Sequence, residues 1–290
     1  MIRATIVMAL ALASCSSVDK KTQITIALSS ETEIPKELDS FAVRIISTRT
    51  GELRFSQDYF PTSGREFPTT LAVIPLDEDA LASPVRVEIE GRKGSAIFLR
   101  RQSVVSYLKD RNILLAMPLR MACFQFRDCG PNSTCSGGQC VADAIDGAHV
   151  TDYDAALVFG RPGGCFDEER CLGGATEIAI EQDCTFAIPA GADGANGNVA
   201  IRWAAAPERI LALDATDAQE GWMRLAADRG KLSQGACDSH FQRHGGDGAL
   251  LVADWAKSVH FSPSCASKTP RLPYCFSEAT QHSGVGAVVP

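Results

Sequence analysis

The chain has 290 residues, of which 28 are basic and 35 are acidic, so its formal net charge is −7. This acidic balance argues against binding to nucleic acid and against adhesion to anionic membranes through charge. The length exceeds that of a typical single domain, and we expect two hydrophobic cores.

The first fourteen residues have the order of an export signal. Arg3 supplies a positive charge, an apolar run extends from Ala4 to Leu12, and small residues precede Cys15. The run is shorter than the roughly 20 apolar residues that span a bilayer, so we expect residues 1–14 to be a signal peptide that is removed. Removing Arg3 lowers the net charge from −7 to −8.

The end of this segment, Leu12-Ala13-Ser14-Cys15, resembles the lipobox of bacterial lipoproteins. The resemblance implies that Cys15 is lipidated, becomes the first residue of the mature protein and is followed by a tether over residues 15–21. Ser16 stands where an Asp would retain a lipoprotein in the inner membrane, so the resemblance implies an outer-membrane anchor, on the periplasmic face or at the cell surface. No second apolar run approaches spanning length, so we expect the lipid to be the anchor.

Ten cysteines remain when Cys15 is set aside, and all lie between Cys123 and Cys275. An even number of cysteines in an exported chain indicates disulfides, here five, whereas a cytosolic chain with as many would more often bind metal. The cysteine content therefore supports export independently of the signal.

Residues 22–121 contain no cysteine, and apolar and polar side chains alternate along short runs. Such runs, separated by Gly, Pro, Ser and Asp, are typical of half-buried antiparallel strands. Seven of them in about a hundred residues predict an immunoglobulin-like β-sandwich. The runs are Ile24–Leu28, Phe41–Ile45, Leu53–Phe55, Leu71–Val73, Val85–Ile89, Ile97–Leu99 and Ile113–Leu115.

Residues 122–147 hold four cysteines at the spacing Cys123-x5-Cys129-x5-Cys135-x4-Cys140. A segment of this composition cannot bury a core and must be held by its crosslinks, and its sequence permits three pairings. The spacing resembles the front half of an epidermal-growth-factor-like repeat. That resemblance implies that Cys123 pairs with Cys135 and Cys129 with Cys140.

Residues 148–290 are again rich in strand-like runs and predict a second, jelly-roll-like β-sandwich, so the expected fold class is all-β. The runs are Ala156–Phe159, Glu177–Ile180, Thr185–Ile188, Val199–Trp203, Arg209–Leu213, Trp222–Leu225, Ala249–Ala253 and Ser258–Phe261. Proximity in sequence predicts the disulfides Cys165–Cys171 and Cys265–Cys275, which leaves Cys184 to pair with Cys237.

The chain lacks the common local signatures of catalysis. We find no Gly-x-Ser-x-Gly elbow, no phosphate loop and no His-Glu-x-x-His. These absences make an enzyme less favoured without excluding one, because catalytic triads need no local motif. Asp214, Asp217 and Glu220 are the carboxylates that a hydrolase on a jelly-roll scaffold would use.

Two segments resemble metal sites weakly. His240 and His244 have the i, i+4 spacing of a zinc pair, but neighbouring glycines indicate a loop, and Cys237 is needed for the disulfide. The segment 193–198 offers oxygen ligands, but its Asn-Gly step is more simply a hairpin turn. We expect no metal and no cofactor.

Trp222 is the aromatic residue that the alternation of its strand places outward. Met223 and Leu225 take the opposite face, so Trp222 and Arg224 form a candidate ligand-binding pair. The alternative is that a neighbouring loop covers Trp222.

The layout of a lipobox, a sandwich, a cysteine segment containing Cys129-Gly130-Pro131-Asn132-Ser133-Thr134-Cys135 and a second sandwich resembles lipoproteins of large-genome predatory soil bacteria. This resemblance is one of layout, and it does not imply a function for any residue of the chain. The sequence therefore predicts a lipid-anchored surface binding or structural module, with a glycan or an envelope protein as partner. The alternatives are a secreted polysaccharide or peptide hydrolase and a subunit of an envelope assembly.

Overall fold

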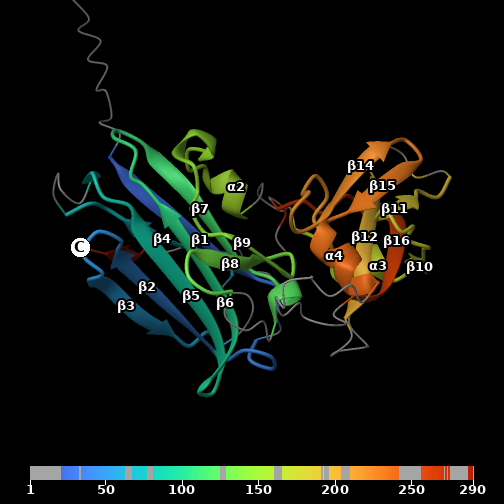
Figure 1. The fold of residues 1–290 in the computed structure, drawn as a ribbon. Coiled ribbons are helices and arrows are strands. Elements are labelled where there is room, and N and C mark those ends of the chain that lie inside the picture. The colour runs from blue at the N-terminus through green and yellow to red at the C-terminus, as the bar shows by residue number, and fades with distance from the viewer. Residues whose placement is uncertain are drawn as a thin grey trace, which may run out of the picture.

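The computed structural model of the chain consists mainly of strands with a few short helices (Figure 1). The expected signal segment and Cys15 lie outside the described residues. In the part of the chain that is described, no helix is long and apolar enough to cross a membrane. The structure describes residues 21–32, 34–62, 67–76, 81–124, 129–159, 165–190, 192, 196–203, 210–241, 256–270, 272, 274 and 287–289.

A first sandwich contains two four-stranded sheets, with the orders β17-β4-β1-β7 and β3-β2-β5-β6. Strand β1 runs antiparallel to β4 and parallel to β7. Strand β17 comes from the end of the chain and pairs in parallel with β4. The strands are β1 (Gln23–Ser30), β2 (Ser40–Ser47), β3 (Leu53–Tyr59), β4 (Thr69–Val73), β5 (Val85–Lys93), β6 (Ala96–Val105), β7 (Asn112–Leu119) and β17 (Ala287–Val289).

The core of this sandwich forms because apolar residues recur at every second position and therefore share one face of each strand. Ile24 and Ile26 of β1 and Val87 and Ile89 of β5 are buried in it. The seven strands predicted for residues 22–121 are confirmed. Their order differs from that of a constant-type immunoglobulin domain, in which the first two strands share a sheet, because here β1 and β2 belong to different sheets.

The cysteine module, residues 122–147, packs against β6 and covers that edge of its sheet. It contains β8 (Ser133–Ser136) and β9 (Gln139–Ala142), and the short helix η2 (Met121–Cys123) leads into it. The amide of Gln102 donates to Thr134, and the amide of Val104 donates to the carbonyl of Asp143. The module is therefore a fixed part of the first sandwich.

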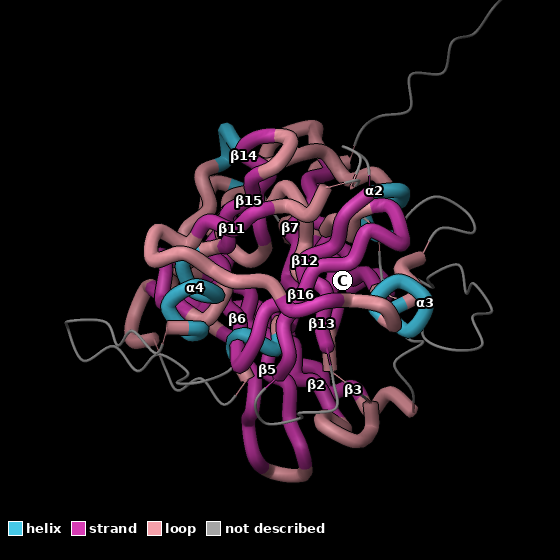
Figure 2. The backbone as a smooth tube through the Cα atoms, turned by 90° about the vertical axis from the view of Figure 1, so that its right-hand side faces the viewer, coloured by secondary structure: helices cyan, strands magenta, loops and turns pink. Residues whose placement is uncertain are grey.

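The second half has two smaller sheets, with the orders β10-β16-β12-β13 and β11-β15-β14. Phe186, Val199, Trp222 and Phe261 are buried between them. Figure 2, in which this half faces the viewer, shows α3 and α4 on opposite sides of the β12–β16 pair. The elements are α3 (Glu168–Leu172), β10 (Thr176–Glu177), β11 (Thr185–Ala187), β12 (Asn196–Trp203), β13 (Ile210–Ala212), β14 (Trp222–Ala226), β15 (Arg229–Leu232), α4 (Gln234–His240) and β16 (Ala256–Ala266).

Three expectations for the second half need correction. The run Ala156–Phe159 is not a strand but lies in a helix, α2 (Ala155–Phe159), because the Asp154 carboxylate accepts the amide hydrogen of Ala156 at the start of the helix. The strand expected at Glu177–Ile180 ends at Glu177. Strand β15 was not expected, and the run Ala249–Ala253 lies outside the described residues.

The disulfides agree with the expected pairing at three places and differ at two. Cys123 pairs with Cys135, Cys129 with Cys140 and Cys184 with Cys237, as expected. Cys171 pairs with Cys265, 94 positions away, so the expected bridges Cys165–Cys171 and Cys265–Cys275 are wrong. The reason is spatial: α3 packs on β16, which brings Cys171 and Cys265 to a Cα–Cα distance of 5.4 Å.

The boundary expected between residues 147 and 148 does not coincide with a change of packing. Val150 belongs to the core of the first sandwich, and the amide of Leu114 on β7 donates to the carbonyl of Thr151. Helix α2 also lies beside the first sandwich in Figure 1. The chain therefore leaves the first sandwich after α2, and β17 returns to it.

Candidate functional site

The two halves meet at a group of six charged side chains, which we call the junction cluster: Glu31, Arg101, Arg120, Asp214, Glu220 and Lys268. Three are acidic and three are basic, so the charges of the cluster balance. Each acid forms an ion pair with at least one of the bases. The cluster links the first sandwich, the cysteine module and the second half.

Arg120 is the centre of the cluster. It lies between the end of β7 and η2, where the chain passes from the last strand of its sheet into the cysteine module. Its Nη1 donates to Glu31 at 2.7 Å, its Nη2 to Asp214 at 2.5 Å and its Nε to Glu220 at 3.2 Å. The planar guanidinium can therefore bind three carboxylates at once, which a lysine could not do with the same geometry.

Asp214 is held in place by backbone contacts within the second half. It follows β13, and its carbonyl accepts the amide hydrogen of Trp222 at 2.9 Å. A Cβ on Gly221 would lie 1.9 Å from that carbonyl oxygen, so this close approach requires glycine. The Asp214 side chain is 1% exposed and also forms a salt bridge with Lys268.

Lys268 reaches Asp214 because Asn198 fixes the chain beyond β16. The Asn198 side chain accepts the amide hydrogen of Lys268 at 2.8 Å and donates to the carbonyl of Cys265 at 3.1 Å. The Lys268 ammonium lies 4.6 Å from the centre of the Tyr274 ring, a cation–π contact. The cation is therefore held by one carboxylate and one aromatic face.

Glu220 joins the second half to the first sandwich and to the module. Its Oε1 forms a salt bridge with Arg101 of β6 and accepts a hydrogen bond from Ser136 of β8 at 2.7 Å. Burial by itself raises the pKa of Glu220, but the positive charges of Arg101 and Arg120 and the hydrogen bonds outweigh it and lower that pKa to about 2. Glu220 is therefore ionised at neutral pH.

Asp214 and Glu220 do not have the properties of a general acid. Burial by itself raises the pKa of Asp214. The positive charges of Arg120 and Lys268 lower that pKa by more than burial raises it, so the net shift is downward. Asp217 differs, because burial raises its pKa, yet its carboxylate accepts amide hydrogens from Gln219 and Glu220 and closes a turn. Asp214 and Glu220 thus both form ion pairs with Arg120, whereas Asp217 does not take part in the cluster.

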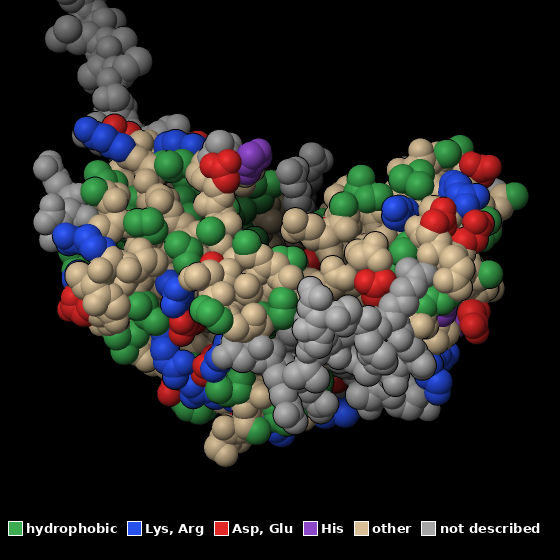
Figure 3. Space-filling view, in the orientation of Figure 1, with side chains coloured by type: hydrophobic (Ala, Val, Ile, Leu, Met, Phe, Trp, Pro, Cys, Tyr) green, Lys and Arg blue, Asp and Glu red, His purple; other side chains and the backbone are tan. Residues whose placement is uncertain are grey.

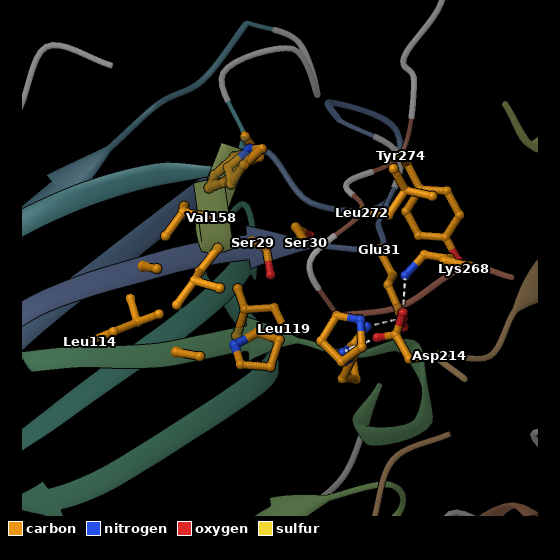
Figure 4. A pocket seen from close by; sticks show the side chains of 18 residues that line it. Ser29, Ser30, Glu31, Leu114, Leu119, Val158, Asp214, Lys268, Leu272 and Tyr274 are labelled. Atoms are coloured by element: carbon orange, nitrogen blue, oxygen red, sulfur yellow. Dashed lines mark hydrogen bonds and ion pairs between the residues drawn. The ribbon is translucent and has the colours of Figure 1, made fainter. Parts of the chain in front are cut away.

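Beside the cluster lies the junction pocket, drawn in Figure 4. The floor of the pocket is the outer face of β1 and β7, where Ala27, Leu114 and Ala116 present apolar side chains. Helix α2 contributes Leu157 and Val158. The side chains of Leu272 and Tyr274 form the opposite side, and Glu31, Asp214 and Lys268 close one end.

The junction pocket opens to solvent between the two halves. Figure 3 shows the surface hollowed there on the face that it presents. The space that solvent can reach inside it is about 100 Å³. Because the charges at its closed end pair with one another, the surface that it offers to a ligand is mostly apolar.

The expected ligand-binding pair of Trp222 and Arg224 is wrong. Trp222 is 2% exposed and packs on Phe186, with the ring centres 5.8 Å apart. Strand β14 turns the Trp222 face toward the core, and Leu225 is 56% exposed instead. Arg224 donates to the carbonyl of Ala227. Trp222 therefore cannot serve as a stacking platform.

The prediction of a loop around His240 is wrong, because residues 234–240 form the helix α4. His244 and residues 193–195 lie outside the described residues. Within the ranges that the structure describes, no group of three or more His, Cys, Asp or Glu side chains is arranged so that it could hold a metal ion. The described part of the chain thus contains no constellation from which metal chemistry could be argued.

The fold and the site together define an all-β, disulfide-stapled protein whose halves meet at a buried charge cluster beside an apolar pocket. No protein-family model, no curated protein and no solved structure matches the chain.

Proposed function

We propose that this chain is a lipid-anchored cell-envelope protein that acts as a binding module, with the junction pocket as its binding site. One observation carries the choice of site. The pocket is lined by residues from both halves, such as Ala116 and Leu272, beside a cluster that holds those halves together. The paired strands β1 and β7 form one side as a regular sheet surface, and such a preorganised surface lowers the entropic cost of binding.

The chemistry of the pocket favours an envelope protein over a glycan as partner. Its floor and sides are apolar, and the charges at its end are already paired. Trp222, the aromatic side chain expected to contact a ligand, is buried elsewhere. An apolar side chain presented by a partner protein fits such a pocket better than a hydroxyl-rich ligand does.

The placement in the envelope is supported by the disulfides. Four are present among the described residues, and such bridges persist in oxidising compartments. Metabolic labelling with a fatty acid tests the anchor. We expect label on the wild-type chain and none on the Cys15→Ala variant, which would no longer sediment with membranes. Equal labelling of both would contradict the anchor at Cys15.

A photo-crosslinking amino acid placed at Ala116 in the native organism tests the binding site. Ala116 is exposed on the floor of the pocket, and Ile97, 45% exposed beside the β5–β6 turn, provides the matched control position. We expect one defined crosslinked partner from position 116 and none from position 97. The substitution Ala116→Trp should abolish the same interaction, whereas Ile97→Trp should not. Identical products at both positions, or none at position 116, would contradict the proposal.

A further inference from the structure

One edge of the β3-β2-β5-β6 sheet is covered by another part of the chain, and the other edge is exposed. The β6 edge is covered by the cysteine module through hydrogen bonds such as that from the Gln102 amide to Thr134. Strand β3 forms the other edge, and no strand among the described residues pairs with its free side. Six of its seven residues are exposed, and only Phe55 is half-buried. Its outward-facing backbone groups are thus available to another strand.

The order of residues on β3 makes the strand complementary to itself. If two copies of β3 align antiparallel about Ser56, Arg54 of each copy lies opposite Asp58 of the other. In the same alignment Leu53 lies opposite Tyr59. Directly opposed residues interact across strands, so both charge pairs and both apolar pairs are favourable. A shift of the alignment by one residue would lose every charge pair.

The charge pairs and the apolar pairs would lie on opposite faces of β3. Arg54, Ser56 and Asp58 share one face, because side chains alternate along a strand. Leu53, 52% exposed, and Tyr59, 36% exposed, share the other face with Phe55, and Phe60 just beyond the strand is 73% exposed. The same alignment would therefore satisfy the charges on one face and cover apolar surface on the other.

Among the described residues, the ion pairs of Arg54 and Asp58 each include one side chain that is more than half exposed, although Arg92 itself is only 21% exposed. Arg54 contacts Glu52 at 3.3 Å, and Asp58 contacts Arg92 at 3.5 Å. Exposed pairs of this kind contribute little. Arg54 and Asp58 can consequently exchange or share these partners when a second strand arrives.

We propose that β3 is a homodimerisation edge, at which a second copy of this chain pairs antiparallel about Ser56 and joins two four-stranded sheets into one of eight strands. The two-fold symmetry makes the contact isologous, so it closes at the dimer. Its Arg54–Asp58 contacts fix the register, and the partner is the chain itself.

Charge-swap variants test the proposal on the oxidised, full chain by sedimentation equilibrium. We expect reversible dimers of the wild type. Arg54→Asp and Asp58→Arg should each weaken dimerisation roughly tenfold or more, because like charges then oppose one another at two places. A mixture of the two variants should dimerise again, since one then presents two acids and the other two bases.

Cysteine crosslinking tests the register separately. Ser56→Cys should form an intermolecular disulfide under oxidation, because directly opposed Cα atoms lie about 4.5–5.5 Å apart. Gln57→Cys should not, because its own symmetry mate lies two residues out of register. A monomeric wild type, a mixture that stays monomeric, or equal crosslinking at both positions would overturn the proposal, as would an edge that captures only a different protein.

Discussion

Arg120 and Asp214 are 94 positions apart in the sequence and form a buried ion pair that joins the two halves of the molecule. The pair matters because Arg120 directly follows β7 of the first sandwich, and Asp214 lies in the second half. The same guanidinium also binds Glu31 and Glu220. One side chain therefore bridges both halves beside the junction pocket.

Arg120→Met should destabilise the protein strongly. The substitution leaves buried carboxylates without their main counter-charge, which typically costs about 3–5 kcal/mol. Arg111→Met is the matched control, because its pair with Asp152 is exposed and should contribute about 0–1 kcal/mol. Urea denaturation followed by circular dichroism measures both changes. Equal losses for the two variants would contradict the role given to Arg120.

The stability contributed by Glu220 should depend on pH in a defined window. Its pKa in the folded chain is about 2, below the ordinary 4.5, so folding favours the ionised form. That contribution is fully present above pH 4.5, amounts to roughly 3 kcal/mol, and is lost as the pH falls from about 4.5 to about 2.

Glu220→Gln tests this dependence. We expect the variant to be less stable than the wild type at pH 7 and the difference to narrow below pH 4.5. Glu52→Gln, in the exposed turn before β3, serves as the control and should follow the wild type at each pH. A difference between Glu220→Gln and wild type that is as large at pH 3 as at pH 7 would refute the assignment.

Gly235→Ala should separate α4 from the cysteine module. A Cβ at Gly235 would lie 1.7 Å from the carbonyl oxygen of Gly137, so one of the two segments must move. We expect a loss of about 1–3 kcal/mol, the usual cost of overpacking. At Gly174 nothing lies within 4 Å of the added atom, so Gly174→Ala should change the free energy of unfolding little. Thermal denaturation of both variants measures the two losses. Indistinguishable melting temperatures would contradict the close contact between Gly235 and Gly137.

The Cys171–Cys265 bridge can be read directly by mass spectrometry. A non-reducing digest should yield a peptide pair that joins Cys171 to Cys265. A pair that joins Cys165 to Cys171 would contradict the structure. Replacing Cys171 and Cys265 together by Ala should cost about 5 kcal/mol on the chain-entropy model, against about 3 kcal/mol for Cys129 and Cys140, whose loop is much shorter.

Seven of the eight strands of the first sandwich could be predicted because their periodicity is strong, whereas β17 was not predicted. Every second residue of runs such as Val85–Ile89 is buried, and no cysteine interrupts these runs. The order of the strands could not be predicted, because alternation identifies a strand and its faces but not its neighbours. The parallel pairing of β1 with β7 is such a case.

The second half was harder to predict because local patterns compete there with long-range contacts. Burial alternates along β15, but its buried position 230 is a glycine and gives no apolar signal in the sequence. Gly230 lies beneath the Phe186 ring, where a Cβ would be 2.2 Å from the nearest ring carbon. Met223 and Leu225 predict that their face of β14 is the buried one, whereas Trp222 on the other face is buried against Phe186. The larger apolar surface of Trp222 outweighs that of Leu225.

The junction cluster had only a partial signal in the sequence. Asp214 and Glu220 were recognised as notable carboxylates, but their partner Arg120 lies in another domain, and its contacts depend on the packing of the halves. Spacing along the chain carries no information about such a contact. The same limit explains why Cys171 was paired with its sequence neighbour and not with Cys265.

Differential scanning calorimetry of the oxidised chain tests the central claim most directly, namely that the two halves form one unit through the contacts of Arg120. We predict a single cooperative transition for the wild type and two resolved transitions for Arg120→Met, since the second half then melts independently. Two transitions in the wild type, or one unchanged transition in Arg120→Met, would contradict it.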